Sequence, residues 1–295
     1  MPAQSCLVTP VYHFPYMFTK TTIKPYISNK VVILNINIIS ELETNSRFAL
    51  LTCAVDITKD GLHIVIRHDA KTNENWGRSY NVFCRIRSKE RLQLGYISYD
   101  MNAALQSISL QLVGATEADY PMLWHYTSDK EYKKQIRGEI ANDLGIEISE
   151  VKEKLTAFAN GSITGKSKHK YYKAFYVESD KLRREVLKYA SESAPDVLKR
   201  AIEQSKRDIP KELDWTDTDI RETSAEMRNK ASVFFFVWTW YERLIRQAML
   251  TVLTDGIELH DAVYSKMDVD IKTIEAIILE RTGFKVLIGK EIPKQ

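Results

Sequence analysis

The chain of 295 residues has only three cysteines, and Cys6, Cys53 and Cys84 are widely separated. No two of them form a CxxC pair, which argues against a structural zinc site and against a disulfide scaffold. Few, separated thiols are typical of proteins from a reducing compartment. We therefore expect a cytoplasmic protein with reduced cysteines.

The sequence also lacks a long hydrophobic run. Its longest apolar stretch, residues 232–241 (SVFFFVWTWY), is far shorter than the ~20 residues that cross a bilayer. No apolar leader follows basic residues at the N-terminus. We expect no membrane partner, and we interpret Trp238, Trp240 and Tyr241 as parts of a buried helix.

Net charge is small, at +3, so composition permits a nucleic-acid partner without requiring one. A basic groove would have to come from local clustering. The sequence has no P-loop and no G-x-G-x-x-G motif, which argues against a P-loop NTPase and against a Rossmann-type dinucleotide-binding enzyme. It also has no H-E-x-x-H motif, which argues against a zinc protease that uses this motif. A hydrophobic content of 44% predicts a globular chain with a substantial core.

Residues 1–70 contain four of the eight prolines and several β-branched runs, including residues 31–39. A strand is expected at residues 62–67, after the Asp60-Gly61 turn. We find no chemistry in this part and expect a small N-terminal subdomain.

Further along the chain, the pattern predicts several helices and a few strands. A core strand is expected at 94–99, with Asn102 capping a helix whose apolar stripe is Met101, Leu105, Ile108 and Leu112. Helices are expected at 128–144, from a Ser149 cap to Gly161, at 222–253 and at 268–282. Residues 162–174 read as a basic loop, and residues 284–288 as a final strand.

Two aspartates stand out because each lies at the end or tip of a strand-like run. Asp100 follows residues 94–99 (LGYISY), and Asp261 lies within residues 257–264 (IELHDAVY). Two carboxylates brought together from distant segments can hold two Mg²⁺ ions. This pair is the candidate metal site of the chain.

Four blocks, taken in order, resemble the single-subunit RNA polymerases of bacteriophages and mitochondria, which share their core with the family-A DNA polymerases. Residues 74–80 (ENWGRSY) are similar to an acid-x-x-Gly-Arg-x-Tyr element. Residues 100–106 (DMNAALQ) resemble the first metal-binding aspartate block, although Ala104 replaces a glycine and Ser107 a histidine. Residues 152–161 (KEKLTAFANG) resemble the lysine-bearing fingers helix, and His260-Asp261 resembles the second aspartate and its histidine.

Two departures limit what the resemblance implies. Asn160 stands where the family has an aromatic residue that influences ribose choice, and Ile148 stands where an arginine is expected. The chain also has no room for the large promoter-binding region of the phage enzymes.

The resemblance implies an α+β fold, a right-hand polymerase palm in which helices back a small antiparallel sheet, with a helical fingers insertion and a small N-terminal subdomain. The implied domains are an N-terminal subdomain (1–70), the first part of the palm (71–128), a fingers-like insertion (129–230) and the second part of the palm (231–295).

The resemblance further implies roles for single residues. Asp100, Asp261 and Lys152 would be catalytic, and the two aspartates would bind two Mg²⁺ ions, for which Mn²⁺ can substitute. The expected nucleotide-binding residues are Met101, Gln106, Lys152, Asn160, Gly161 and His260. The expected template-binding residues are Gly77, Arg78 and Tyr80.

The function that follows is template-directed nucleotide transfer. We expect a small DNA-dependent RNA polymerase or primase that uses a DNA template and nucleoside triphosphates, with a helicase or replication protein as a possible partner. Two alternatives stay open: a small family-A-like DNA polymerase of a mobile element, and an inactive palm that only binds nucleic acid.

Overall fold

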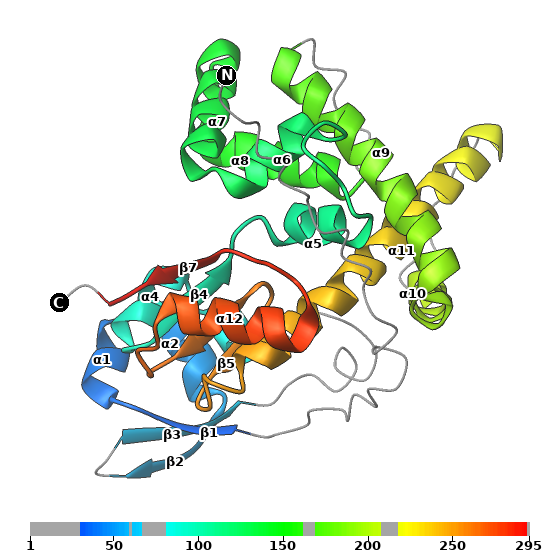
Figure 1. The fold of residues 1–295 in the computed structure, drawn as a ribbon. Coiled ribbons are helices and arrows are strands. Elements are labelled where there is room, and N and C mark those ends of the chain that lie inside the picture. The colour runs from blue at the N-terminus through cyan, green and yellow to red at the C-terminus, as the bar shows by residue number, and fades with distance from the viewer. Residues whose placement is uncertain (1–29, 59–60, 67–80, 162–168, 208–217, 294–295) are drawn as a thin grey trace, which may run out of the picture.

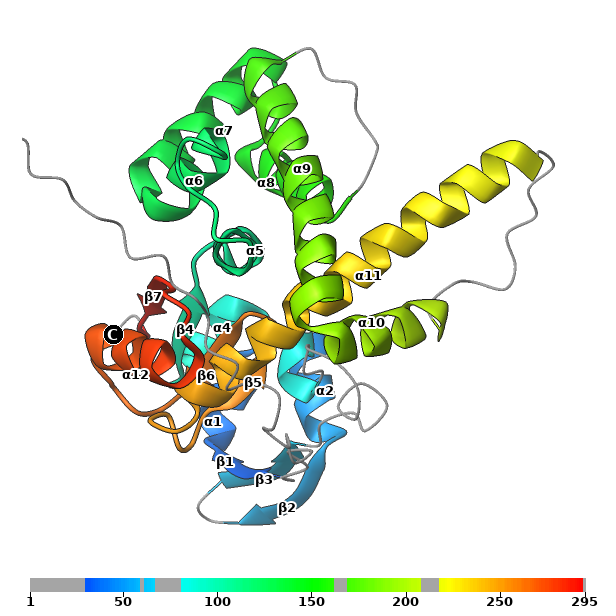
Figure 2. The same cartoon turned by 45° about the vertical axis from the view of Figure 1, so that its right-hand side comes forward.

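The structure is a computed structural model that describes residues 30–58, 61–66, 81–161, 169–207 and 218–293. Figures 1 and 2 show a strand-bearing part and a group of helices, α6 to α9, with α5 lying between them. The long helix α11 extends from the strand-bearing part past the end of α9.

The strands form two antiparallel sheets. The strands are β1 (Lys30–Leu34), β2 (Ala54–Thr58), β3 (Gly61–Ile66), β4 (Ile97–Met101), β5 (Ile257–Leu259), β6 (Ala262–Ser265) and β7 (Ile288–Glu291). The first sheet has the order β1-β3-β2, and the second has the order β5-β6-β4-β7. The second sheet therefore joins β4 to three strands that come much later in the sequence.

Helices make up most of the rest of the described chain. They are α1 (Ile36–Glu41), α2 (Thr44–Leu51), the 3₁₀-helix η2 (Val82–Arg85), α4 (Ser88–Gln93), α5 (Ala104–Leu112), α6 (Pro121–Ser128), α7 (Lys130–Leu144), α8 (Ile148–Ala159), α9 (Lys170–Ser193), α10 (Pro195–Arg207), α11 (Thr218–Met249) and α12 (Ile271–Thr282).

The second sheet separates two hydrophobic clusters because side chains alternate between its faces. Tyr99 and Val263 belong to the larger cluster, which also contains residues of α5 to α12. Leu259 and Tyr264 belong to the smaller cluster, shared with β1, β3, α1 and α2. Both faces of this sheet are thus partly covered, which fixes its strands in position.

The first sheet depends on a glycine at the start of β3. Gly61 has a φ of +139°, and a Cβ there would lie 2.4 Å from the main-chain oxygen of Leu34. Only glycine fits this close approach of β1 and β3. The turn predicted at Asp60-Gly61 is consistent with this position, although Asp60 itself lies outside the described residues.

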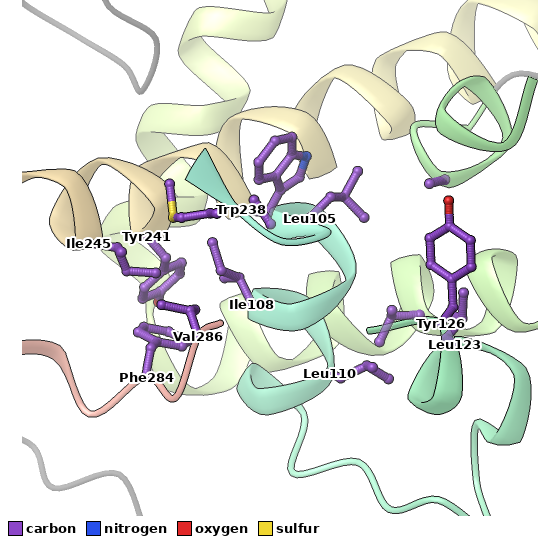
Figure 3. Close-up of a cluster of buried hydrophobic side chains, with 14 of the residues drawn as sticks. Leu105, Ile108, Leu110, Leu123, Tyr126, Trp238, Tyr241, Ile245, Phe284 and Val286 are labelled. Atoms are coloured by element: carbon purple, nitrogen blue, oxygen red, sulfur yellow. The ribbon is translucent and has the colours of Figure 1, made fainter. Parts of the chain in front are cut away.

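Helix α11 carries the aromatic centre of the larger cluster. Figure 3 shows Trp238, Tyr241 and Ile245 of this helix in the same cluster as Leu105 and Ile108 of α5. Trp238 is 2% exposed and Tyr241 is 7% exposed, so the interpretation of this aromatic run as core is confirmed.

The Trp238→Ala substitution should destabilise the fold strongly. Removing a fully buried indole leaves a cavity that costs about 3–5 kcal/mol. The free energy of unfolding, measured by chemical denaturation, should fall by this amount. Trp240 lies only partly buried against the cluster, so Trp240→Ala is the control with a smaller effect. Equal losses in the two variants would contradict this picture of the core.

Two predicted helix caps and the end of one predicted loop were wrong in detail. Asn102 does not cap α5, because its side chain is engaged by Thr127 and Lys133, and the N-cap position is Ala103. Ser149 does not cap α8, which begins at Ile148 after Glu147. The predicted basic loop ends early, because the His169 ring accepts a hydrogen bond from the Tyr171 N–H and α9 begins at Lys170.

Strand boundaries also differ from the prediction. Phe284 and Val286 alternate as expected for a strand, but they pack into the larger cluster, and β7 begins only at Ile288. The β-branched run at 31–39 divides into β1 and α1, because the Asn35 side chain caps α1. The long helix predicted at 222–253 is α11, displaced by four residues at each end.

The predicted fold class is confirmed: the chain is α+β, with a small antiparallel sheet backed by helices, a helical insertion and a small N-terminal sheet. The division into domains at residues 70, 128 and 230 stays a prediction. Within the described residues, no helix combines the length and apolar character that would span a membrane.

Candidate active site

Asp100 lies on β4 between two very small neighbours. Its cross-strand partners are Ala262 on β6 and Gly289 on β7. Cross-strand neighbours on the same face are the side chains most able to cover a strand residue. Because alanine and glycine cover so little, part of Asp100 stays accessible to solvent while the other four residues of β4 are buried.

Asp261 lies in the turn that joins β5 to β6. Leu259 pairs with Ala262, so His260 and Asp261 form the two residues of the hairpin loop. The main-chain oxygen of Asp261 accepts a hydrogen bond of 3.1 Å from the Met101 N–H, one residue beyond Asp100. The sheet therefore brings the hairpin turn of Asp261 against the strand of Asp100, although the two residues lie far apart in the sequence.

The electrostatics show that the two carboxylates influence each other. Desolvation by the surrounding protein, followed by the negative charge of Asp261, raises the pKa of Asp100 to about 7. Glu291 on β7 acts in the same direction, while Lys152 and Lys133 oppose it. Strong pKa shifts of this kind gather at functional sites. Carboxylates that repel one another in the metal-free chain are well placed to bind a cation.

The Asp100→Asn substitution should stabilise the metal-free chain at alkaline pH. The pKa of Asp100 in the folded state is raised above its ordinary value of 3.8, so the folded chain binds this proton more tightly than the unfolded chain. The resulting loss of stability begins above about pH 4 and is complete above about pH 7. In EDTA, the melting temperature of the variant should exceed that of the wild type at pH 8.

The same comparison at pH 4 supplies the control, because there the two proteins should melt at nearly the same temperature. A variant that melts below the wild type at pH 8 would contradict the proposed repulsion at Asp100.

Basic side chains on α7 and α8 lie close enough to Asp100 to act on its charge. Lys152 on α8 and Lys133 on α7 both interact electrostatically with Asp100. The Lys133 ammonium donates a 2.6 Å hydrogen bond to Asn102 Oδ1 and lies 5.2 Å from the centre of the Tyr126 ring. Arg137, one turn further along α7, donates to the Tyr126 hydroxyl. The site thus combines acidic side chains from the sheet and its hairpin turn with basic side chains from α7 and α8.

Lys133 and Arg137 are not among the site residues that the sequence predicts. Desolvation, then the positive charges of Arg137 and Lys152, lowers the pKa of Lys133 to about 8. Cations held this close to one another favour a polyanionic ligand between them. The only sequence signal is their spacing of four residues on a predicted helix, and other lysines of the same helix share such spacings.

The remaining predicted nucleotide-binding residues have varied surroundings. Met101 and Gln106 are buried, with 2% and 7% of their surfaces exposed. Asn160 ends α8, and its side chain donates to the Thr156 carbonyl at 3.0 Å. Gly161 has a φ of +96°, and a Cβ there would lie 2.8 Å from the Ala231 Cβ on α11. Gly161 therefore has a packing role, and nucleotide contacts by these residues stay predictions.

The predicted template-binding residues Gly77, Arg78 and Tyr80 lie outside the described residues. His260, predicted to contact nucleotide, lies in the hairpin turn beside Asp261 and has a φ of +40°. His260 is the neighbour of Asp261 in this turn, and its contact with nucleotide stays a prediction.

The donor set at this site suits a hard divalent cation. Asp100 and Asp261 supply carboxylate oxygens, which Mg²⁺ prefers, and Asp100 is partly accessible to solvent. Within the described residues, no cluster of three or more histidine, cysteine or acidic side chains is arranged to hold a metal. A metal bound here would therefore take its remaining ligands from water or substrate, as Mg²⁺ commonly does.

Comparisons with known proteins assign no family. No family model matches the chain, and no curated protein matches its sequence. One similar solved structure is the POL domain of Pol1 from M. smegmatis, in complex with DNA primer-template and dNTP. The TM-score is 0.40 and the sequence identity 14%, over 83% of this chain and 49% of that chain. The chain thus spans about half of that structure, and a likeness at this level assigns no activity.

Proposed function

We infer that the chain is a template-directed nucleotidyltransferase, a small DNA-dependent RNA polymerase or primase. The observation that carries this proposal is that the hairpin turn of Asp261 adjoins the strand of Asp100, and that Lys133 and Lys152 interact electrostatically with Asp100. Paired carboxylates bind divalent cations, and facing cations bind phosphates. A metal–triphosphate needs both, and its natural use is phosphoryl transfer.

Each residue has a defined task in this proposal. Asp100 and Asp261 would hold Mg²⁺ ions, which when bound supply Lewis-acid stabilisation of a phosphate ester. Lys152 and Lys133 bind the triphosphate and offset the negative charge that develops on the leaving pyrophosphate. Asn102 orients the Lys133 ammonium toward the sheet through the 2.6 Å hydrogen bond.

The proposed preference for ribonucleotides rests on the sequence. The resemblance at residues 100–106 is to RNA polymerases, and Ser107-Ile108 follows Gln106, where a DNA polymerase would have a glutamate as a steric gate. The expected template is single-stranded DNA, and the expected product is a primer or short RNA.

One assay tests the activity, the sugar and the primer requirement together. The purified chain is incubated with primed or unprimed single-stranded DNA and Mg²⁺ or Mn²⁺, with ribonucleotides and deoxyribonucleotides in separate reactions. Products from ribonucleotides support the proposal. Extension with deoxyribonucleotides alone would identify a DNA polymerase. DNA binding without incorporation would identify a nucleic-acid-binding module.

A further inference from the structure

The turn that carries Asp261 is held through two successive main-chain carbonyls. The Asp261 carbonyl accepts a hydrogen bond from the Met101 N–H of β4. The preceding carbonyl, that of His260, accepts a hydrogen bond from the Arg246 guanidinium of α11. One contact ties the turn to the strand of Asp100, and the other ties it to a helix of the core.

Arg246 is itself held by a buried acid. Its Nη1 lies 3.0 Å from Oε2 of Glu242, one helical turn earlier, and the two side chains are 1% and 0% exposed. Burying an ion pair is costly, and apolar side chains of similar size often stabilise a core as well or better. The neighbouring residues of α11 in the same core, such as Val237 and Ile245, are apolar. Fold stability alone is therefore a weak reason for this pair.

The backbone of the turn explains what the guanidinium does. His260 has a φ of +40°, in the left-handed region that a non-glycine residue adopts only when its surroundings hold it there. A charged donor on the His260 carbonyl fixes the peptide plane between His260 and Asp261. The orientation of that plane determines the direction in which the Asp261 side chain leaves the turn.

We propose that Arg246, braced by Glu242, is a positioning residue that directs the Asp261 carboxylate toward Asp100 for cation binding. The proposal rests on the proposed function only in taking Asp261 as a cation ligand, and it requires no nucleotide or template. Residues that orient metal ligands typically change metal affinity by about 10–100-fold when they are replaced.

The test is Mn²⁺ binding to the full chain, measured by electron paramagnetic resonance without nucleotide or DNA. Arg246→Met should weaken binding by about ten-fold or more. The decisive variant combines Glu242→Met with Arg246→Met, since it removes both buried charges and preserves apolar volume. Arg246→Met alone leaves the Glu242 charge buried without its partner and should lower the melting temperature. The double variant should melt closer to the wild type than Arg246→Met does, while its Mn²⁺ binding should stay weak.

A buried acid elsewhere provides the matched control. Glu90 is 1% exposed and accepts hydrogen bonds from the Ser46 hydroxyl and from the Glu43 N–H. Glu90→Gln should lower the melting temperature and leave Mn²⁺ binding unchanged. Such a result supports the proposal by showing that reduced stability alone does not weaken the cation site.

Three results would overturn the proposal. The first is a double methionine variant that binds Mn²⁺ as tightly as the wild type, because the pair would then be only structural. The second is an Asp100→Asn variant that binds Mn²⁺ as tightly as the wild type. The third is a wild-type chain that binds no Mn²⁺. Failure of the incorporation assay with Mn²⁺ binding intact would refute only the proposed function.

Discussion

The Asp261→Asn substitution is expected to reduce nucleotide incorporation by about three orders of magnitude or more, with the fold intact. Asparagine keeps the shape of the side chain but removes the charge that a divalent cation requires. The turn should survive, because its two hydrogen bonds are made by main-chain carbonyls of His260 and Asp261. Primer extension measures the activity, and thermal unfolding measures the stability.

A nearby aspartate outside the site supplies the control for this substitution. Asp268 is largely exposed, and its carboxylate pairs with the Lys290 ammonium. Asp268→Asn should retain incorporation close to that of the wild type. If Asp261→Asn keeps a tenth of the wild-type rate or more, Asp261 is not a cation ligand in the reaction.

The Lys152→Ala substitution is expected to lower turnover by about 100-fold while changing template affinity little. Lys152 is exposed on α8 and interacts with Asp100, so its charge lies where a triphosphate bound between the sheet and the helices would sit. The loss should come from weaker neutralisation of the leaving pyrophosphate. Single-turnover kinetics and DNA-binding titrations separate the two effects.

Lys154, two residues further along α8, is a matched control because its ammonium is paired with Glu150 at 2.6 Å. Lys154→Ala should leave turnover nearly unchanged. Equal losses of turnover and template affinity in Lys152→Ala would instead place Lys152 in a nucleic-acid groove.

The strand-like runs beside Asp100 and Asp261 predicted the local structure around both residues. Apolar residues before Asp100 indicated a strand at 94–99, and the observed strand β4 begins three residues later, at Ile97, and includes Asp100 near its end. The apolar runs on both sides of His260-Asp261 indicated strand on each side, and β5 and β6 confirm it. Such signals are local, so a single sequence shows them well.

What the sequence could not show depends on distant contacts. Nothing in the spacing of residues on α7 separates Lys133 from Lys130 or Lys134, and only the packing of α7 against Tyr126 and Asn102 selects it. The contact of Arg246 with the hairpin turn depends in the same way on how α11 packs against the sheet. The small side chains that leave Asp100 exposed come from β6 and β7, whose pairing is non-local.

Anomalous diffraction from crystals grown with Mn²⁺ is the most direct test of the central claim, that Asp100 and Asp261 bind divalent cations together. We predict anomalous peaks in contact with the carboxylates of both residues, and their loss in Asp261→Asn crystals. Peaks bound elsewhere, with these two carboxylates free of metal, would contradict the account.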